Sequence, residues 1–134
     1  MSKKHRDSFR VMLVEDEENF RRVLAGFLLA KFPSMVLEEA ADGKEAIERI
    51  RDFIPDLVFI DIQLPGENGL EVTRRIKALY PDTKVVIPTS YDFPEYREAA
   101  RACGAYQFFS KGSCTAEEIE NFVEGLCEKR SPVP

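Results

Sequence analysis

The chain has 134 residues and a formal net charge of −5 at pH 7, with 44% hydrophobic and 32% charged residues. This length fits one domain with a single core, and the composition is that of a soluble globular protein. The negative charge argues against a general binder of nucleic acid or membrane surfaces, because both attract basic proteins. No apolar run approaches the roughly 20 residues that cross a bilayer, and no signal peptide is recognisable. We therefore expect a cytoplasmic protein.

Cysteine usage supports the same compartment. Cys103, Cys114 and Cys127 are odd in number and have no CxxC spacing. Reduced thiols explain this pattern better than a zinc site does.

The first half of the chain alternates strand and helix patterns. Phe9 to Val14 predicts a strand, and acidic residues follow it at once. Val36 to Ala40 predicts a second strand, and the turn signal Asp42-Gly43 follows it. Apolar residues at helical spacing predict a helix after each strand: Phe20, Val23, Leu24, Phe27 and Leu28, then Ala46, Ile47 and Ile50.

The alternation continues three more times. Leu57 to Ile60 is nearly unbroken in apolar residues, as expected for a strand buried on both faces of a parallel sheet. Strands are also predicted over 84–87 and 107–110, with a helix that ends at Pro81 between the first two of these three strands. Pro94 opens a short fourth helix, because a first-turn proline lacks only an N–H that would have no partner. A capping box and an apolar stripe predict the last helix: Thr115 and Glu118, then Ile119, Phe122, Val123 and Leu126.

Five βα units with short connections predict an α/β fold. The sheet is expected to be parallel and covered by helices on both faces, because each crossover is right-handed. We expect one domain over 8–128 and flexible tails over 1–7 and 129–134. In such sheets the ligand site lies at the carboxyl ends of the strands.

Charged and hydroxyl residues follow four of the five predicted strands. They are Glu15 and Asp16, then Asp61, then Thr89 and Ser90, then Lys111. Carboxylates brought together resist ionisation unless a cation lies among them, and oxygen ligands suit Mg²⁺. One carboxylate can then attack phosphorus, while lysine and hydroxyl donors neutralise the phosphoryl oxygens. Each residue alone has an ordinary structural explanation, but their coincidence at one sheet edge favours a site.

Four segments resemble the receiver domains of two-component response regulators. They are Val11 to Asp16 (VMLVED), Asp56 to Gly69 (DLVFIDIQLPGENG), Thr89-Ser90 and Phe108 to Lys111 (FFSK). The resemblance covers roughly residues 8 to 128 in the family's order and spacing. It implies a flavodoxin-like, doubly wound fold with five helices and a five-stranded parallel sheet of order 2-1-3-4-5.

The resemblance also implies the acceptor and the metal ligands. Asp61 would be the phosphorylated residue. Asp16 and Asp61 would bind Mg²⁺ directly, together with the backbone carbonyl of Gln63, and Glu15 would act mainly through water.

The remaining motif residues are implied to bind the phosphoryl group and to switch. Thr89, with Ser90 beside it, would donate to that group in the active state, and Lys111 would pair with it. Phe108 matches the family's aromatic switch position. Because it lacks the hydroxyl of a tyrosine, we expect its inward orientation to be populated even without phosphate.

The implied function is a phosphoacceptor switch and not an enzyme that turns over an external substrate. The expected phosphodonor is a sensor histidine kinase or a phosphotransfer protein. The expected output is a downstream protein or a missing C-terminal output domain, with homodimer formation on phosphorylation. No direct contact with nucleic acid or membrane is expected.

Two departures from the family pattern concern the backbone. Pro88 stands inside a strand expected to be central, where proline removes a ladder donor; we expect it to end the strand early and shift Thr89. Gly112 follows Lys111 where many relatives have proline. We expect a trans bond there, because a cis bond without proline costs roughly 3 kcal/mol, with the wider φ range of Gly112 redirecting the chain.

Other function classes remain open. A receiver that serves as an unphosphorylated scaffold is one, and the change at Pro88 keeps it open. A flavin-binding protein of related architecture is another, but the acidic run Glu15 to Glu18 would repel a phosphate after the first strand. A phosphatase or a nucleoside triphosphatase is disfavoured further, since no GxxxxGK[ST] run is present.

Overall fold

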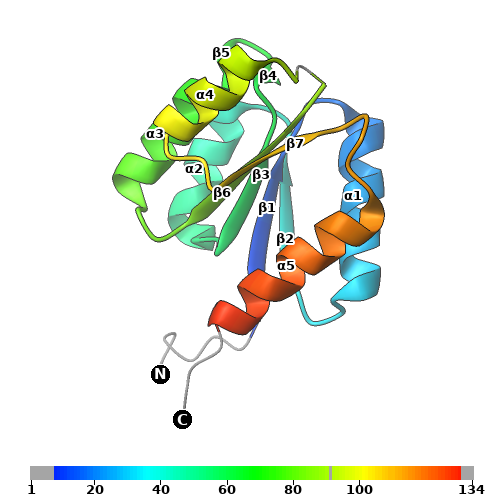
Figure 1. The fold of residues 1–134 in the computed structure, drawn as a ribbon. Coiled ribbons are helices and arrows are strands. Elements are labelled where there is room, and N and C mark those ends of the chain that lie inside the picture. Colours follow the sequence, from blue (N-terminus) through cyan, green and yellow to red (C-terminus); the bar gives the residue numbers. More distant parts are fainter. Residues whose placement is uncertain (1–7, 91, 131–134) are drawn as a thin grey trace.

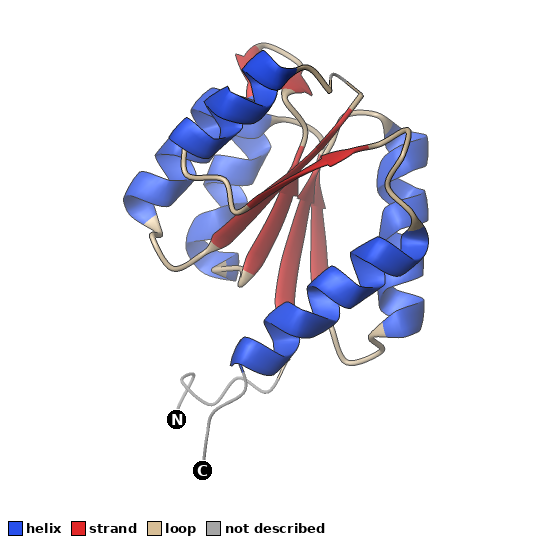
Figure 2. Cartoon of the chain, viewed as in Figure 1, coloured by secondary structure: helices blue, strands red, loops and turns tan. Residues whose placement is uncertain are grey.

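A parallel five-stranded sheet lies between two layers of helices (Figure 1; Figure 2). The computed structural model describes residues 8–90 and 92–130, so the expected tail residues 1–7 and 131–134 lie outside it. The strand order is β2-β1-β3-β6-β7, and every neighbouring pair is parallel. Numbered among themselves along the chain, these five strands have the order 2-1-3-4-5, which confirms the expectation.

The elements follow the sequence patterns closely. The main strands are β1 (Arg10–Val14), β2 (Val36–Ala40), β3 (Leu57–Ile60), β6 (Lys84–Thr89) and β7 (Gln107–Ser110). The helices are α1 (Glu18–Lys31), α2 (Gly43–Phe53), α3 (Gly69–Leu79), α4 (Pro94–Ala102) and α5 (Ala116–Arg130). A small antiparallel hairpin was not predicted: β4 (Gln63–Leu64) and β5 (Glu67–Asn68). Because α5 runs to Arg130, the expected tail over 129–134 begins two residues too early.

Local side chains explain where several helices begin. Asp42 and Asn68 cap α2 and α3 by accepting bonds from backbone amides of the first turn. The N–H of Thr115 donates to Oε1 of Glu118 at 2.8 Å, and the N–H of Glu118 donates to Oγ1 of Thr115 at 3.1 Å. This pair confirms the predicted capping box. Pro94 lies in the first turn of α4, also as predicted.

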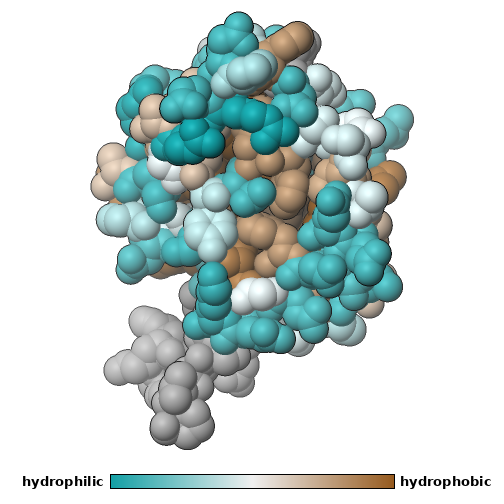
Figure 3. Space-filling view, viewed as in Figure 1, coloured by the Kyte–Doolittle hydropathy of each residue, from teal (hydrophilic) through white to brown (hydrophobic). Residues whose placement is uncertain are grey.

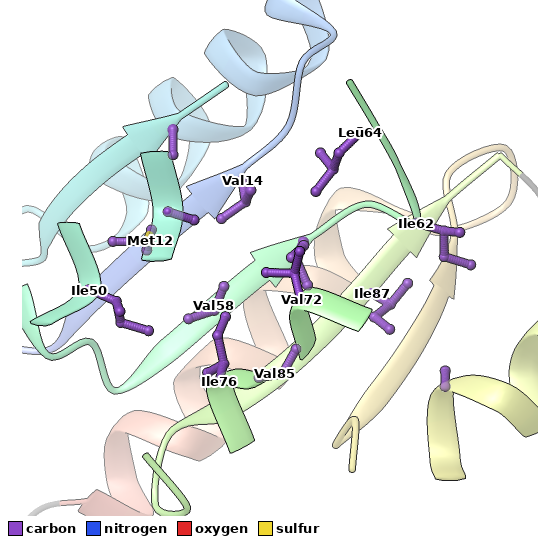
Figure 4. Packing of buried hydrophobic residues seen from close by; sticks show 14 of the residues in the cluster. Met12, Val14, Ile50, Val58, Ile62, Leu64, Val72, Ile76, Val85 and Ile87 are labelled. Carbon is purple, nitrogen blue, oxygen red and sulfur yellow. The ribbon is translucent and has the colours of Figure 1, made fainter. Parts of the chain in front are cut away.

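The buried side chains form two clusters, one on each face of the sheet. Side chains of α2, α3 and α4 pack on one face, and those of α1 and α5 pack on the other. Successive residues of β1 alternate between them, with Met12 and Val14 in the first cluster and Val11 and Leu13 in the second. Figure 4 shows the first cluster, where Val58 and Val85 of the sheet meet Ile76 of α3. This burial supplies the main favourable free energy of folding.

The strand β6 continues through Pro88 to Thr89, so the expectation that Pro88 ends it early is wrong. The carbonyl of Thr89 accepts from the N–H of Lys111 at 2.9 Å, on the side of β7. Backbone groups of successive strand residues point to opposite sides, so the nitrogen of Pro88 faces β3. The pairing of β3 with β6 ends before Pro88, at Phe59 and Val86. The missing N–H of Pro88 therefore lies where the pairing with β3 has ended, while the pairing of β6 with β7 continues through Thr89.

The turn after β7 contains neither a cis peptide bond nor a glycine with a positive φ. The described residues contain no cis peptide bond, which confirms the trans bond between Lys111 and Gly112. Gly112 does not adopt a positive φ, so the expected use of its wider φ range is wrong. Instead, the N–H groups of Ser113 and Cys114 donate to the carbonyl of Ser110 at 3.2 and 2.9 Å, and this tight turn redirects the chain.

None of the helices over the described ranges 8–90 and 92–130 has the length and apolar character needed to span a membrane.

Candidate functional site

The predicted site residues lie along one edge of the sheet. Glu15 directly follows β1, Asp61 follows β3, Thr89 ends β6, and Lys111 follows β7. The N–H of Asp61 donates to the carbonyl of Val14 at 3.2 Å, so the ladder holds the two carboxylate-bearing loops together. In sheets of this kind, ligands bind outside the carboxyl ends of the strands where the strand order reverses, and β1 and β3 are the strands at that point.

Lys111 joins two buried carboxylates. Its Nζ lies 2.9 Å from Oε1 of Glu15 and 3.0 Å from Oδ2 of Asp61. Only 5%, 9% and 9% of the side chains of Glu15, Asp61 and Lys111 are exposed. The same Nζ lies 3.4 Å from Oε1 of Glu17 and 4.2 Å from the ring centre of Phe20. The structure therefore brings three predicted site residues into direct contact.

Burial perturbs the protonation of this cluster. It raises the pKa of Glu15 to about 7, and the negative charge of Asp61 adds to the rise although the hydrogen bond with Lys111 opposes it. Burial also lowers the pKa of Lys111, but the contacts with Glu15 and Asp61 outweigh it and leave that pKa above its ordinary value. Lys111 is therefore charged at neutral pH, and the two acids compete for one ammonium group. A further cation nearby would relieve their repulsion.

Oxygen atoms suited to a hard cation lie beside this ion cluster. Oδ1 of Asp61 is buried and has no hydrogen-bond partner among the described residues. Asp16 is exposed and lines a cavity of about 560 Å³ together with Gln63. Buried polar atoms normally have a partner, so Oδ1 is available as a ligand, and Mg²⁺ needs only a few protein oxygens because it retains several waters. The residues present fit a magnesium ion.

The carboxylates of Glu15, Asp16 and Asp61 do not by themselves form a closed ligand set. Within the part of the chain that the structure describes, no three His, Cys, Asp or Glu side chains are arranged to hold a metal by themselves. Lys111 links Glu15 to Asp61, while Asp16 points to the solvent-exposed cavity.

Gly69 has a role in the site that sequence reasoning missed. A Cβ atom on Gly69 would lie 1.9 Å from the carbonyl oxygen of Asp61. The N–H of Gly69 donates to the carbonyl of Ile62 at 2.6 Å, and Oγ1 of Thr73 donates to the carbonyl of Gly69 at 2.8 Å. The start of α3 therefore packs directly on the Asp61 backbone. The only sequence signal is that Gly69 ends the segment resembling the receiver family.

The remaining predicted residues lie on β6 and β7 or directly after β6. Thr89 is fully buried at the end of β6, and Ser90 is exposed after it. Phe108 is half-buried on β7 and packs against the core cluster under α4. The guanidinium carbon of Arg97 lies 4.8 Å from its ring centre. Whether Phe108 and Thr89 move together stays a prediction.

The fold and this acid–lysine cluster define a flavodoxin-like protein with a polar site at the switch point of the sheet. The response regulator receiver domain family matches residues 11–124. The chain belongs to that family.

Relatives in the same family support this assignment. The two-component response regulator ORR41 of Oryza sativa subsp. japonica is 40% identical over 108 residues, which cover 79% of this chain and 85% of that protein. The response regulator GacA of Pseudomonas viridiflava is 31% identical over 111 residues, or 83% of this chain and 52% of that protein. The chain thus spans about half the length of several curated relatives.

A solved structure gives the same result. The LuxR-family two-component response regulator of Aurantimonas sp. superposes with a TM-score of 0.81 at 30% identity, covering 95% of this chain and 90% of that one.

Proposed function

We propose that this receiver domain, over residues 8–128, accepts a phosphoryl group on Asp61. The observation that carries the proposal is the buried contact between Asp61 and Lys111 at 3.0 Å. Among the described residues, Oδ1 of Asp61 has no hydrogen-bond partner, and an ammonium group lies next to Oδ2. A nucleophilic carboxylate with an adjacent cation is the arrangement that phosphoryl transfer requires.

In the proposed reaction, a carboxylate oxygen of Asp61 forms a bond to the phosphorus of a phosphohistidine. The bond from phosphorus to the imidazole nitrogen breaks, and the imidazole keeps the electron pair and takes a proton. Lys111 then pairs with the new phosphoryl oxygens, and the hydroxyl of Thr89, with Ser90 beside it, donates to them.

Asp16, Asp61 and the carbonyl of Gln63 would hold Mg²⁺, and Glu15 would contact it through water. When bound, this ion supplies positive charge that neutralises the phosphoryl oxygens during transfer. Glu15 would also hold Lys111 near Asp61, because its Oε1 lies 2.9 Å from Nζ of Lys111.

The proposed partners are a sensor histidine kinase or phosphotransfer protein and a downstream protein or C-terminal output domain. An apolar surface over β7, between α4 and α5, is a suitable face for the downstream partner or for a second copy after phosphorylation (Figure 3). We propose a cytoplasmic location, no direct contact with nucleic acid or membrane, and no turnover of an external substrate.

The test is the intact mass of the protein after incubation with Mg²⁺ and acetyl phosphate. We expect one added phosphoryl group, which hydroxylamine removes, as it does from acyl phosphates. Asp61→Asn should abolish the gain, whereas Asp52→Asn, at an exposed position of α2, should label like the parent. Labelling of Asp61→Asn at the parental rate would contradict the assignment, and no labelling of the parent would favour an unphosphorylated scaffold.

A further inference from the structure

Glu17 is a third carboxylate within reach of Lys111. Its Oε1 lies 3.4 Å from Nζ, and its N–H donates to Oε2 of Glu15 at 3.2 Å. Its side chain is 62% exposed, in contrast to the buried carboxylates of Glu15 and Asp61. Glu17 is therefore the member of the ion cluster that faces solvent.

The start of α1 directs Glu17 toward Lys111. Glu17 is the N-cap residue of α1, and its side chain makes no capping hydrogen bond. A carboxylate at this place would ordinarily bond to the free amides of the first turn. Phe20, one helical turn later, also contacts Lys111 with its ring. The first turn of α1 thus presents an acid and an aromatic ring to one ammonium group.

The charge of Glu17 acts at short range on any incoming phosphodonor. Its carboxylate and that of Asp61 contact the same Nζ, at 3.4 and 3.0 Å. They therefore lie closer together than the Debye length, which is about 8 Å at physiological ionic strength. A donor that reaches Asp61 brings its own negative charge into this field, and a dianion is repelled more than a monoanion.

We propose that Glu17 selects among small phosphodonors by their charge. The inference rests on the proposed phosphorylation of Asp61. With either donor, an Asp61 oxygen forms the bond to phosphorus. Acetyl phosphate, a dianion near pH 7, releases acetate with the electron pair, and phosphoramidate, a monoanion, releases ammonia. Glu17 disfavours the dianionic donor.

The experiment compares labelling rates with acetyl phosphate and phosphoramidate at one Mg²⁺ concentration. Glu17→Gln should raise the ratio of the acetyl phosphate rate to the phosphoramidate rate by about threefold, as expected for one unit of charge about 6 Å away in water. Glu17→Lys should raise it further, and added salt should shrink both effects. The matched control is Glu18→Gln, which removes the same charge from an exposed neighbour paired with Arg22 at 3.0 Å and should leave the ratio unchanged.

The outcomes distinguish the role of Glu17 from the proposed phosphorylation of Asp61. If the parent is labelled at Asp61 and Glu17→Gln keeps the parental ratio, or Glu18→Gln changes it equally, the role of Glu17 is wrong and the acceptor stands. If neither donor labels the parent, the proposal that small donors phosphorylate Asp61 is wrong, and the proposed selection of donors by Glu17 is wrong as well.

Discussion

Two glycines allow close approaches between segments of the chain, and one of them, Gly69, lies against Asp61. A Cβ on Gly43 would lie 2.0 Å from Oε1 of Glu67, and a Cβ on Gly69 would lie 1.9 Å from the carbonyl oxygen of Asp61. The first neighbour is the end of a flexible side chain, although Val72 also lies close to Gly43. The second is backbone, fixed by the hydrogen bond of the Asp61 N–H to β1. Gly69 is therefore the stricter position.

Gly69→Ala should destabilise the protein by about 1–3 kcal/mol, the usual range for overpacking. The start of α3 would have to move away from Asp61, so the rate of Asp61 labelling should fall as well. Urea unfolding measures the first effect, and intact mass against time measures the second.

Gly26→Ala is the matched control for this substitution. Gly26 lies inside α1, and a Cβ there would meet no atom of the described residues within 4 Å. Alanine is favoured over glycine in a helix by about 0.5–1 kcal/mol, so this variant should be more stable than the parent. If the Gly69→Ala protein were as stable as the Gly26→Ala protein, the backbone at Asp61 would be able to shift away from the added Cβ without a loss of stability.

At the scale of elements, sequence patterns located every main strand and helix because each buries a regular apolar face. The hairpin of β4 and β5 escaped prediction since two-residue strands are too short to show a period. The prediction that Pro88 ends its strand was wrong for a related reason. The effect of a proline depends on which neighbouring strand its nitrogen faces, and the sheet as a whole determines that. Apolar periodicity carries no information about such pairing.

The strands β6 and β7 are the elements expected to respond to phosphorylation. Thr89 ends β6, and Phe108 lies opposite Ile87 in the paired ladder. A phosphoryl group on Asp61 should draw the Thr89 hydroxyl toward it, because a charge-assisted hydrogen bond is strong. Phe108 should then turn inward and lose the contact with Arg97. Structures with and without beryllofluoride, which imitates the phosphoryl group, test this.

Arg97→Ala provides the control for this coupling. Contacts between a cation and an aromatic ring contribute about 0.5–1 kcal/mol at exposed sites, so removing Arg97 should favour the inward ring even without beryllofluoride. An identical Phe108 rotamer and an unmoved Thr89 in all four structures would mean that Phe108 is a fixed core residue.

Over the whole molecule, the site depends on contacts between parts of the chain that are remote in sequence. Sequence reasoning grouped Glu15, Asp61 and Lys111 because parallel strands end at a common edge. Sequence reasoning could not predict the contacts among them. Because β6 lies between β3 and β7, strand spacing puts about 10 Å between β3 and β7. Only the long lysine side chain crosses that gap. The ion pairs that result follow from its rotamer, which no sequence pattern specifies.

The charge balance of the whole site predicts that Mg²⁺ stabilises the fold. Glu15 and Asp61 share Lys111, and Asp16 adds a further acid beside them. A ligand that binds only the native state stabilises it by mass action, by about 1.4 kcal/mol at ten times its Kd. For a domain of this size, that raises Tm by on the order of 5 °C. The melting temperature should therefore rise with added Mg²⁺.

Asp16→Ala should blunt this rise because it removes a proposed direct ligand. The quantity to compare is the change in Tm on adding Mg²⁺, since losing an acid from a crowded site shifts the baseline Tm as well. Asp52→Ala, at an exposed position of α2, should keep the full rise, and NaCl at matched ionic strength should reproduce little of it because screening alone does not coordinate the carboxylates. Equal rises in the Asp16→Ala and Asp52→Ala proteins would contradict a metal site at Asp16.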